Sequence, residues 1–379
     1  CSMDIRLQKE GTMTRQPIPS RAPGGRLARA ITACARAVIL AGAAVFATAA
    51  FATIGAPDVR FGTGGRVLTP VTSGGGFLRA VATQTDGKFV AVGERYIAGA
   101  QDFLVARFGA NGVLDTGFGT AGLAFADSNG NAPAVDDDIA SAVAIQSDGR
   151  IVVAGTGLGQ VVVMRFTATG ALDGTFGSGG IVRYPAFSET AVVGVIVQPD
   201  GRIVVGAGLR NATEDVRTFG LLRFLANGSL DTDFGCGTPG ACSGRVSAPF
   251  AINDQVIRAI VRQPADGRIV AVGDVLIDTG TGARNDYAFA RYETNGLFDA
   301  TFGSAGSFTG TLATSDNSAT LLKSLIVLTG GEIVAGGDVT DGAAGTLRMA
   351  AVRITPTGGL DATFGSGGAA IVTGVTLSS

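Results

Sequence analysis

One short phrase recurs five times in the sequence and constrains the fold more than any other feature. Each copy has an Arg near the end of an apolar run, a polar turn, and then Leu or Phe, Asp, two variable residues, Phe and Gly. The Arg precedes the Asp by eight residues, and the Phe follows it by three, in every copy. Such a fixed spacing indicates a repeat protein. The Arg, Asp and Phe residues of the five copies are Arg107, Asp115, Phe118; Arg165, Asp173, Phe176; Arg223, Asp231, Phe234; Arg291, Asp299, Phe302; and Arg353, Asp361, Phe364.

Each repeat of about 58 to 68 residues has room for four short strands. In the first repeat these are expected at 66–71, 78–84, 88–92 and 103–108. An Asp-Gly pair between the second and third strands predicts a tight two-residue hairpin with positive φ. The pair is Asp86-Gly87, Asp148-Gly149, Asp200-Gly201 and Asp266-Gly267 in the first four repeats, and Gly330-Gly331 replaces it in the last.

A four-stranded meander cannot bury both of its faces alone, but sheets stacked around an axis can, and this predicts an all-β fold of the β-propeller type. The 59 Gly residues and the short apolar runs agree with that class. We expect residues 53–379 to form a single domain of five four-stranded blades, closed by a terminal strand at 369–375. The five repeats are 65–119, 122–177, 180–235, 244–303 and 306–365.

The composition excludes several kinds of chemistry. The chain has no His, so it has no Ser–His or Cys–His nucleophile pair, no imidazole metal ligand and no His general base. Its formal net charge is −2, and the part after the Arg-rich first 52 residues is more acidic, which argues against a nucleic-acid partner. The sequence predicts no catalytic residue.

The N-terminal part has the order of an export signal. Five Arg residues between residues 13 and 36 precede an uncharged apolar run from Ala37, and small residues then offer cleavage sites after Ala49 or Ala52. The alternative is an uncleaved membrane anchor over residues 37–56. We favour cleavage, which predicts an exported protein in the periplasm, on the outer surface or outside the cell.

Cys236 and Cys242 are the only cysteines after residue 52. They lie six residues apart in an inserted loop, and in an oxidising compartment this spacing suggests a local disulfide. Two free thiols in a loop are the alternative.

The repeat resembles the delta-60 repeat family of exported bacterial proteins. The resemblance rests on Gln-Ser-Asp-Gly-Arg-Ile-Val-Val-Ala-Gly at 146–155, on Arg165-Phe166, and on Leu-Asp-Gly-Thr-Phe-Gly at 172–177. It covers roughly residues 58 to 375. The resemblance implies a propeller-forming repeat and no defined activity.

The repeated Arg and Asp residues have two interpretations. They could form one binding site per repeat, as in some lectin-like propellers, or each pair could tie a strand end to its corner while the Phe packs between blades. We favour the structural interpretation because the spacing is the same in every copy.

In a meander the Asp-Gly hairpins and the Asp-x-x-Phe-Gly corners lie at one edge of the blades, here called the constant rim. The other connections lie at the opposite edge, here called the variable rim, and they differ between repeats. Function is expected at the variable rim. Its connections include 94–101, 127–138, 156–160, 209–216, 274–286 and 338–345.

Two groups of residues at the variable rim are candidate sites. Asp136, Asp137 and Asp138 could bind Ca²⁺, but they lack the alternating ligand spacing of a dedicated loop, and we favour a solvated acidic turn. Asp278, Arg284, Asp286 and Tyr287 could recognise a polar ligand, or they could belong to an ordinary surface loop. No cofactor other than Ca²⁺ is suggested.

The function that the sequence favours is an exported, non-catalytic binding or scaffold module whose partner is a protein, a glycan or a cell-wall component. The alternative is a carboxylate-based glycoside hydrolase or lyase, which needs only two well-placed acids. The absence of Trp and the presence of only four Tyr argue against sugar-stacking platforms. A purely structural role in a surface layer is a third possibility. A membrane partner is expected only if the leader remains attached.

Overall fold

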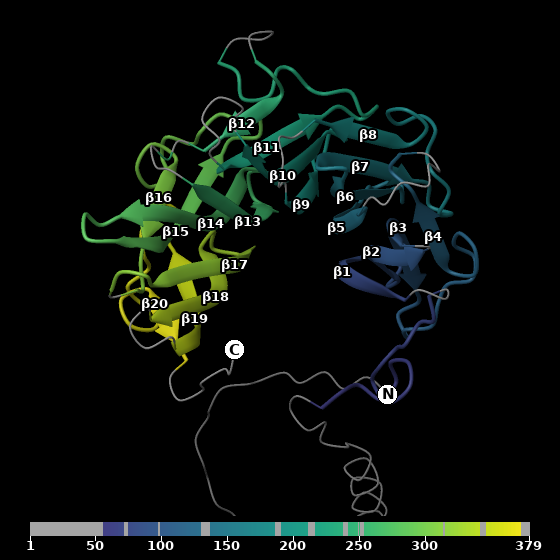
Figure 1. Ribbon diagram of the computed structural model, residues 1–379, viewed down its shortest axis with the longest axis horizontal. Coiled ribbons are helices and arrows are strands. Elements are labelled where there is room, and N and C mark those ends of the chain that lie inside the picture. Colours follow the sequence, from purple (N-terminus) through teal and green to yellow (C-terminus); the bar gives the residue numbers. More distant parts are fainter. Residues whose placement is uncertain are drawn as a thin grey trace, which may run out of the picture. The chain divides into compact units, whose positions relative to one another are not determined.

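The computed structural model describes residues 56–71, 75–97, 99–129, 137–185, 191–210, 217–237, 242–248, 250, 254–313, 315–341 and 346–372. All regular elements among these residues are β-strands, 20 in number. They fall within the unit Asp58–Ser379 (Figure 1). The predicted leader, with its cleavage sites and the alternative anchor, lies outside the described residues except for its last positions.

The strands form five sets of four, here called sheets 1 to 5. Sheet 1 contains β1 (Gly76–Thr83), β2 (Phe89–Ile97), β3 (Ala100–Phe108) and β4 (Leu123–Ala126). Sheet 2 contains β5 (Ile139–Ile145), β6 (Ile151–Gly157), β7 (Gln160–Phe166) and β8 (Ile181–Tyr184). Sheet 3 contains β9 (Val192–Val197), β10 (Ile203–Arg210), β11 (Arg217–Phe224) and β12 (Arg245–Ser247). Sheet 4 contains β13 (Gln255–Arg262), β14 (Ile269–Asp278), β15 (Ala283–Tyr292) and β16 (Ser307–Gly310). Sheet 5 contains β17 (Ala319–Val327), β18 (Ile333–Asp341), β19 (Thr346–Ile354) and β20 (Ala369–Ile371).

Each sheet is an antiparallel meander in which every strand pairs with the next. The first strands of successive sheets contact one another, from β1 to β5, β9, β13 and β17. Figure 1 shows these first strands toward the centre and the fourth strands at the periphery. Sheets 4 and 5 are also joined by a single parallel bridge between Asn285 and Ala319. This is the arrangement of the blades of a β-propeller, as predicted.

The sheets and the sequence repeats are out of phase by one strand. The strand expected at 66–71 does not form, apart from isolated bridges of Arg66 to Gly62 and Thr63. Sheet 1 instead takes its fourth strand, β4, from the start of the next repeat. The same shift makes β20 the fourth strand of sheet 5, where it pairs with β19, and not an additional closing strand. Residues 373–375 of the predicted closing strand lie outside the described residues.

The hairpins between the first and second strands also differ in detail from the predicted two-residue turn. In sheet 1 the Gln84 N–H donates to the Lys88 carbonyl at 2.8 Å, which leaves three residues in the loop. Gly87 ends this loop with a φ of 83°. The loop is therefore a turn followed by a left-handed Gly, a common three-residue hairpin that Asp-Gly also suits.

The core lies between the sheets. Four buried apolar clusters fill the boundaries between sheets 1 and 2, 2 and 3, 3 and 4, and 4 and 5. At each boundary the second and third strands contribute alternating side chains, such as Val90 and Val92 of β2 against Ile151 and Val153 of β6. Because side chains alternate along a strand, each sheet uses both faces for these contacts. The strands therefore read as nearly continuous apolar runs.

The Phe of the repeated phrase closes each boundary. Phe118, Phe176, Phe234 and Phe302 are 0% exposed and belong to the four boundary clusters. A Cβ on Gly170 of the following sheet would lie 3.0 Å from the Phe118 ring, and Gly170 has a φ of 93°. Gly is thus required at this turn both for its backbone conformation and for the approach of the ring.

Replacement of Phe176 by Ala is expected to lower the free energy of unfolding by about 3 to 5 kcal/mol, because it opens a cavity between sheets 2 and 3. Phe364→Ala is the matched control, since this Phe has no following sheet among the described residues and is only partly buried. Denaturant unfolding should show a clearly smaller loss for Phe364→Ala. Equal losses would mean that burial between sheets is not what the Phe contributes.

Candidate functional site

The Arg, Asp and Phe of each repeat form one compact group at the constant rim, here called the corner. The Arg Nε donates to the Asp Oδ2 at 2.7 to 2.9 Å in all five copies. The Arg Cζ lies 4.5 to 5.0 Å from the centroid of the Phe ring. The other Asp oxygen accepts the backbone N–H two residues later, for example Thr175 N–H to Asp173 Oδ1 at 3.1 Å. The Asp therefore fixes the turn and orients the Arg.

The corner also joins each sheet to the next. The Nη1 atoms of Arg107, Arg165, Arg223 and Arg291 donate at 2.5 to 2.7 Å to backbone carbonyls of the following sheet. The N–H of the Gly after each of the first four Phe residues donates at 2.8 Å to the neighbouring carbonyl in the same turn, as Gly177 does to Asn227. Every internal boundary thus has one charged and one neutral hydrogen bond beside the buried Phe.

A second cation reaches the same Asp in four of the repeats. Lys88, Arg150, Arg202 and Arg268 follow the Asp-Gly or equivalent hairpins and lie 2.9 to 3.1 Å from the Oδ2 atom of their corner Asp. In sheet 5 the corresponding residue is Glu332. The charged residues of the constant rim are therefore largely paired with one another, which leaves them little capacity to bind a ligand.

Asp173 shows the electrostatic result. Hydrogen bonds from the hydroxyl and then the backbone of Thr175, together with the charge of Arg165, outweigh burial and lower the pKa of Asp173 to about 2. The carboxylate consequently stays ionised at any ordinary pH.

Two grooves also lie at the constant rim. One of 720 Å³ separates the hairpins of sheets 2 and 3 and is lined by residues that include Asp148, Arg150 and Asp200. A second of 480 Å³ occupies the equivalent place between sheets 3 and 4. Because Asp148 and Asp200 already form ion pairs with neighbouring Arg side chains, the grooves reflect the divergence of the hairpins rather than a prepared site.

At the variable rim, one structurally equivalent position holds a different side chain from sheet to sheet. Each first strand has a β-bulge near its N-terminal end, where one residue has no partner in the register. β-Bulges often redirect side chains near functional sites. The bulged residues of sheets 1 to 5 are Arg79, Ser141, Val193, Arg258 and Lys323.

The three bulged cations each pair with a carboxylate on the second strand of the same sheet. Arg79 Nη2 lies 2.6 Å from Glu94 Oε1, and Glu94 is fully buried. The corresponding pairs are Arg258 with Asp274 and Lys323 with Asp338. Sheets 2 and 3 have Ser and Val at the bulge. The first strands therefore present charge in sheets 1, 4 and 5 only.

Asp274 is the most unusual of these acids. It is 3% exposed, and burial raises its pKa above the ordinary value even though Arg258 donates a hydrogen bond to it. Arg217 and Asp254, a pair whose Nη2 and Oδ2 atoms lie 2.5 Å apart, also act on the pKa of Asp274: the positive charge of Arg217 lowers it and the negative charge of Asp254 raises it. Sequence analysis missed this cluster. The signal would have been an acid after the Gly of the second strand together with a cation on the first.

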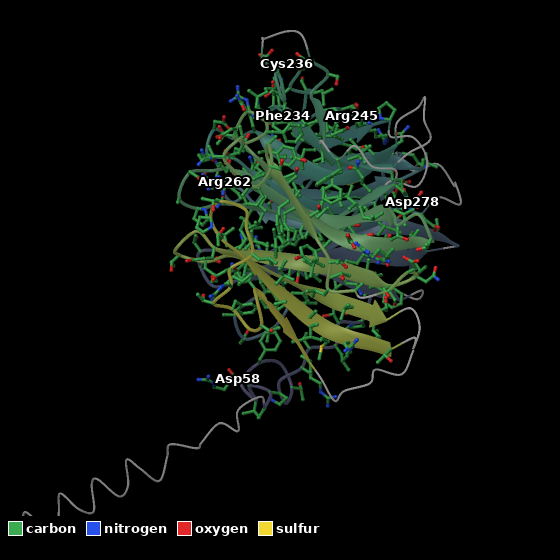
Figure 2. The ribbon with its side chains drawn as sticks, turned by 90° about the vertical axis from the view of Figure 1, so that its left-hand side faces the viewer. Asp58, Phe234, Cys236, Arg245, Arg262 and Asp278 are labelled. Carbon is green, nitrogen blue, oxygen red and sulfur yellow. A yellow bond between two sulfur atoms is a disulfide. The ribbon has the colours of Figure 1, made fainter. Side chains whose placement is uncertain are left out.

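The four residues predicted to bind a polar ligand do not form one site. Arg284 and Asp286 pair through Nε and Oδ1 at 2.8 Å. Tyr287 is 1% exposed and packs against Phe289 in the boundary between sheets 4 and 5, where burial raises its pKa to about 12. Asp278 accepts the Gly280 N–H at 2.8 Å and caps the hairpin turn. Figure 2 shows Asp278 at one edge of the sheets and Arg262 at the opposite edge, which are the variable and constant rims.

The described residues among the predicted Ca²⁺ ligands accept hydrogen bonds from different partners. Asp136 lies outside the described residues. Asp137 is exposed and accepts the Gln101 amide at 2.9 Å, whereas Asp138 is buried and accepts the Ser128 hydroxyl at 2.7 Å. No group of three or more acidic, Cys or His side chains suited to a metal is present in the described part of the chain.

Cys236 and Cys242 form a disulfide with a Cα–Cα distance of 5.6 Å. It closes the loop between the corner of sheet 3 and β12, and Figure 2 shows Cys236 just beyond Phe234 at the end of the molecule. The bridge therefore joins the residues that follow the corner of sheet 3 to those that precede β12.

Five segments of the chain match the model of a β-propeller domain of unknown function, DUF5122: residues 84–118, 146–176, 198–234, 265–302 and 331–364. Each segment spans a hairpin and a corner of one repeat. No curated protein matches the chain.

Several solved structures resemble the protein at low identity. A protein of unknown function from Bacteroides caccae is 13% identical, with a TM-score of 0.28, over 72% of this chain and 95% of the other. A glycoside hydrolase is 10% identical, with a TM-score of 0.34, over 80% of this chain and 66% of the other. An exo-1,5-alpha-L-arabinanase from a bovine ruminal metagenomic library is 13% identical, with a TM-score of 0.31, over 61% of this chain and 76% of the other. These similarities do not separate a binding protein from an enzyme.

The low pKa of Asp173 predicts a pH effect. The folded carboxyl has a pKa of about 2 against an ordinary value of 3.8, so the unfolded chain takes up the proton more readily. The stabilisation is complete above pH 4 and is lost as the pH falls toward 2. Asp173→Asn should lower the free energy of unfolding at pH 7 by about 3 to 5 kcal/mol, since it leaves the buried Arg165 without its counter-charge.

Denaturant unfolding at a series of pH values tests this prediction. The wild type should lose stability more steeply than Asp173→Asn between pH 4 and pH 2, because Asn does not titrate. Parallel pH profiles for the two proteins would show that Asp173 contributes no charge-dependent stability.

Proposed function

We propose that this β-propeller repeat protein is an exported, non-catalytic binding or scaffold module, whose function depends on the side chains that its repeats do not share. Its variable rim contacts the partner, which is a protein, a glycan or a cell-wall component. The constant rim serves the assembly of the sheets.

The bulge position carries this proposal. It is structurally equivalent in all five sheets, yet it holds Arg, Ser, Val, Arg and Lys in turn. A position that served only the fold would need one kind of side chain, as the corner does. The side chains of Arg79 and Lys323 are 45% and 53% exposed, so part of each cation is accessible to a partner.

The alternative, a carboxylate-based carbohydrate-active enzyme, would depend on Asp274. It is the acid beside the bulges whose pKa burial raises, as a general acid requires. Its small exposure and its hydrogen bond from Arg258 argue against access of a substrate. For this reason we place binding first.

Export is part of the proposal. The Arg-rich start and the apolar run that follows support it, and the Cys236–Cys242 disulfide fits an oxidising compartment. Within the described residues, no helix is long and apolar enough to cross a membrane.

A binding screen with two matched variants tests the proposal. The wild-type chain is applied to immobilised glycans, peptidoglycan fragments and cell-envelope proteins. Arg79→Gln removes a cation of the variable rim, and Arg150→Gln removes one of the constant rim. The two Arg side chains are 45% and 42% exposed, and each pairs with a buried acid. Arg79→Gln should weaken binding about tenfold, the effect of one charged hydrogen bond, whereas Arg150→Gln should leave it unchanged.

Two results would contradict the proposal. Equal weakening by both variants would mean that the variable rim has no special role. Cleavage of a glycan by the wild type, with loss of cleavage in Asp274→Asn, would establish the enzyme instead.

A further inference from the structure

The first and last sheets each have one face without a neighbouring sheet among the described residues. On sheet 1 this face includes Val81, which is 63% exposed, and Leu78, which is 51% exposed. On sheet 5 it includes Ile326 and Met349, which are 58% and 46% exposed. Exposed apolar surface of this kind usually marks an interaction site.

The exposed faces of sheets 1 and 5 correspond to the two faces that pack against each other at every internal boundary. The residue equivalent to Val81 packs toward the preceding sheet in sheets 2 to 5, as Val143, Val195, Ile260 and Leu325. The residue equivalent to Ile326 packs toward the following sheet in sheets 3 and 4, as Ile196 and Val261. The exposed face of sheet 1 therefore has the apolar side chains that elsewhere pack against a preceding sheet. The exposed face of sheet 5 has those that elsewhere pack against a following sheet.

The corner of sheet 5 has the donor of a boundary hydrogen bond but not its acceptor. Arg353 binds Asp361 and Thr363, but unlike the other four repeated Arg residues it has no carbonyl of a following sheet to donate to within the described structure. The missing acceptor corresponds to the carbonyl of Ala110 in sheet 1, since Ala168, Ala226, Thr294 and Pro356 occupy that turn position in sheets 2 to 5. No described residue donates a hydrogen bond to Ala110.

The N-terminal segment occupies part of the same place. Residues 58–62 form a similar corner, in which the Arg that pairs with Asp58 is Arg60. Gly62 N–H donates to the Asn111 carbonyl at 2.7 Å, and the Phe61 ring lies 5.8 Å from that of Phe89. These are the contacts that Phe364 and Gly365 would make with sheet 1. Between residues 61–71 and sheet 1 there remains an apolar groove of 560 Å³, whose lining includes Leu78 and Phe89.

We propose that sheet 5 of one molecule docks on sheet 1 of a second copy, in the geometry of an internal boundary. Arg353 then donates to the carbonyl of Ala110 in the second copy, and the Phe364–Gly365 corner displaces residues 58–62. The N-terminal segment acts as a cap that weakens the association until it is displaced. The contact uses two different surfaces and so joins molecules head to tail.

Sedimentation velocity of the full chain over a range of concentrations tests this proposal. The wild type should associate as its concentration rises. Val81→Glu and Ile326→Glu should each raise the dissociation constant about tenfold or more, because each buries a charge without a partner. Leu158→Glu is the matched control: Leu158 is 59% exposed on the β6–β7 hairpin, away from both faces, and should not alter association.

A mixture of variants tests the head-to-tail geometry. Val81→Glu keeps an intact sheet 5 face, and Ile326→Glu keeps an intact sheet 1 face, so an equimolar mixture should form dimers at concentrations at which each variant alone remains monomeric. Phe61→Ala should tighten association of the otherwise wild-type chain, because it weakens the cap.

Several outcomes would overturn the proposal. One is a wild type, and a Phe61→Ala variant, that remain monomeric at every concentration. A second is a mixture that stays monomeric while the wild type associates. A third is a monomer whose melting temperature falls in both Val81→Glu and Ile326→Glu, since the two faces would then meet within one chain.

Discussion

The structure depends on the boundary between one sheet and the next. A four-stranded sheet with two apolar faces gains stability when a neighbouring sheet covers a face, and sheets 2, 3 and 4 have such a neighbour on either side. The corner fixes how closely the neighbours approach. Its Phe is fully buried at all four internal boundaries, and its Arg, held by the Asp of the same sheet, donates to a carbonyl of the next. One short phrase therefore supplies a turn, an apolar contact and a charged hydrogen bond.

This requirement limits which side chains the constant rim can hold, but it does not limit those of the variable rim in the same way. At the constant rim the cations that follow the hairpins converge on the corner Asp residues, so substitution there would disturb a boundary. At the variable rim the bulges tolerate Arg, Ser, Val and Lys without altering the sheet register elsewhere. The fold is therefore compatible with several kinds of side chain at this position of the second rim. That difference is the physical basis for placing recognition there and assembly at the other.

The corner was predictable from sequence because its parts lie within twelve residues of one another and recur at fixed spacing. The five sheets followed from the same repeat, and the disulfide from the spacing of two cysteines. The strand at which each sheet begins was not predictable, because the length of the repeat is the same whichever strand is counted first. Only the strand pairing shows that β4 belongs to the same sheet as β3. The bulges were missed because they depend on the register of a neighbouring strand. Tyr287 was grouped with the loop residues because 274–286 was expected to be a connection, whereas β15 begins at Ala283.

The central claim is that the corners join the sheets into one cooperative structure. Native-state hydrogen exchange at the Gly amides of the corners tests it most directly. Gly119, Gly177, Gly235 and Gly303 donate across a boundary at 2.8 Å, whereas Gly365 has no following sheet among the described residues. The account predicts that the first four amides exchange as slowly as those of the central strands and that the Gly365 amide exchanges rapidly. Rapid exchange at all five, beside protected strands, would contradict it.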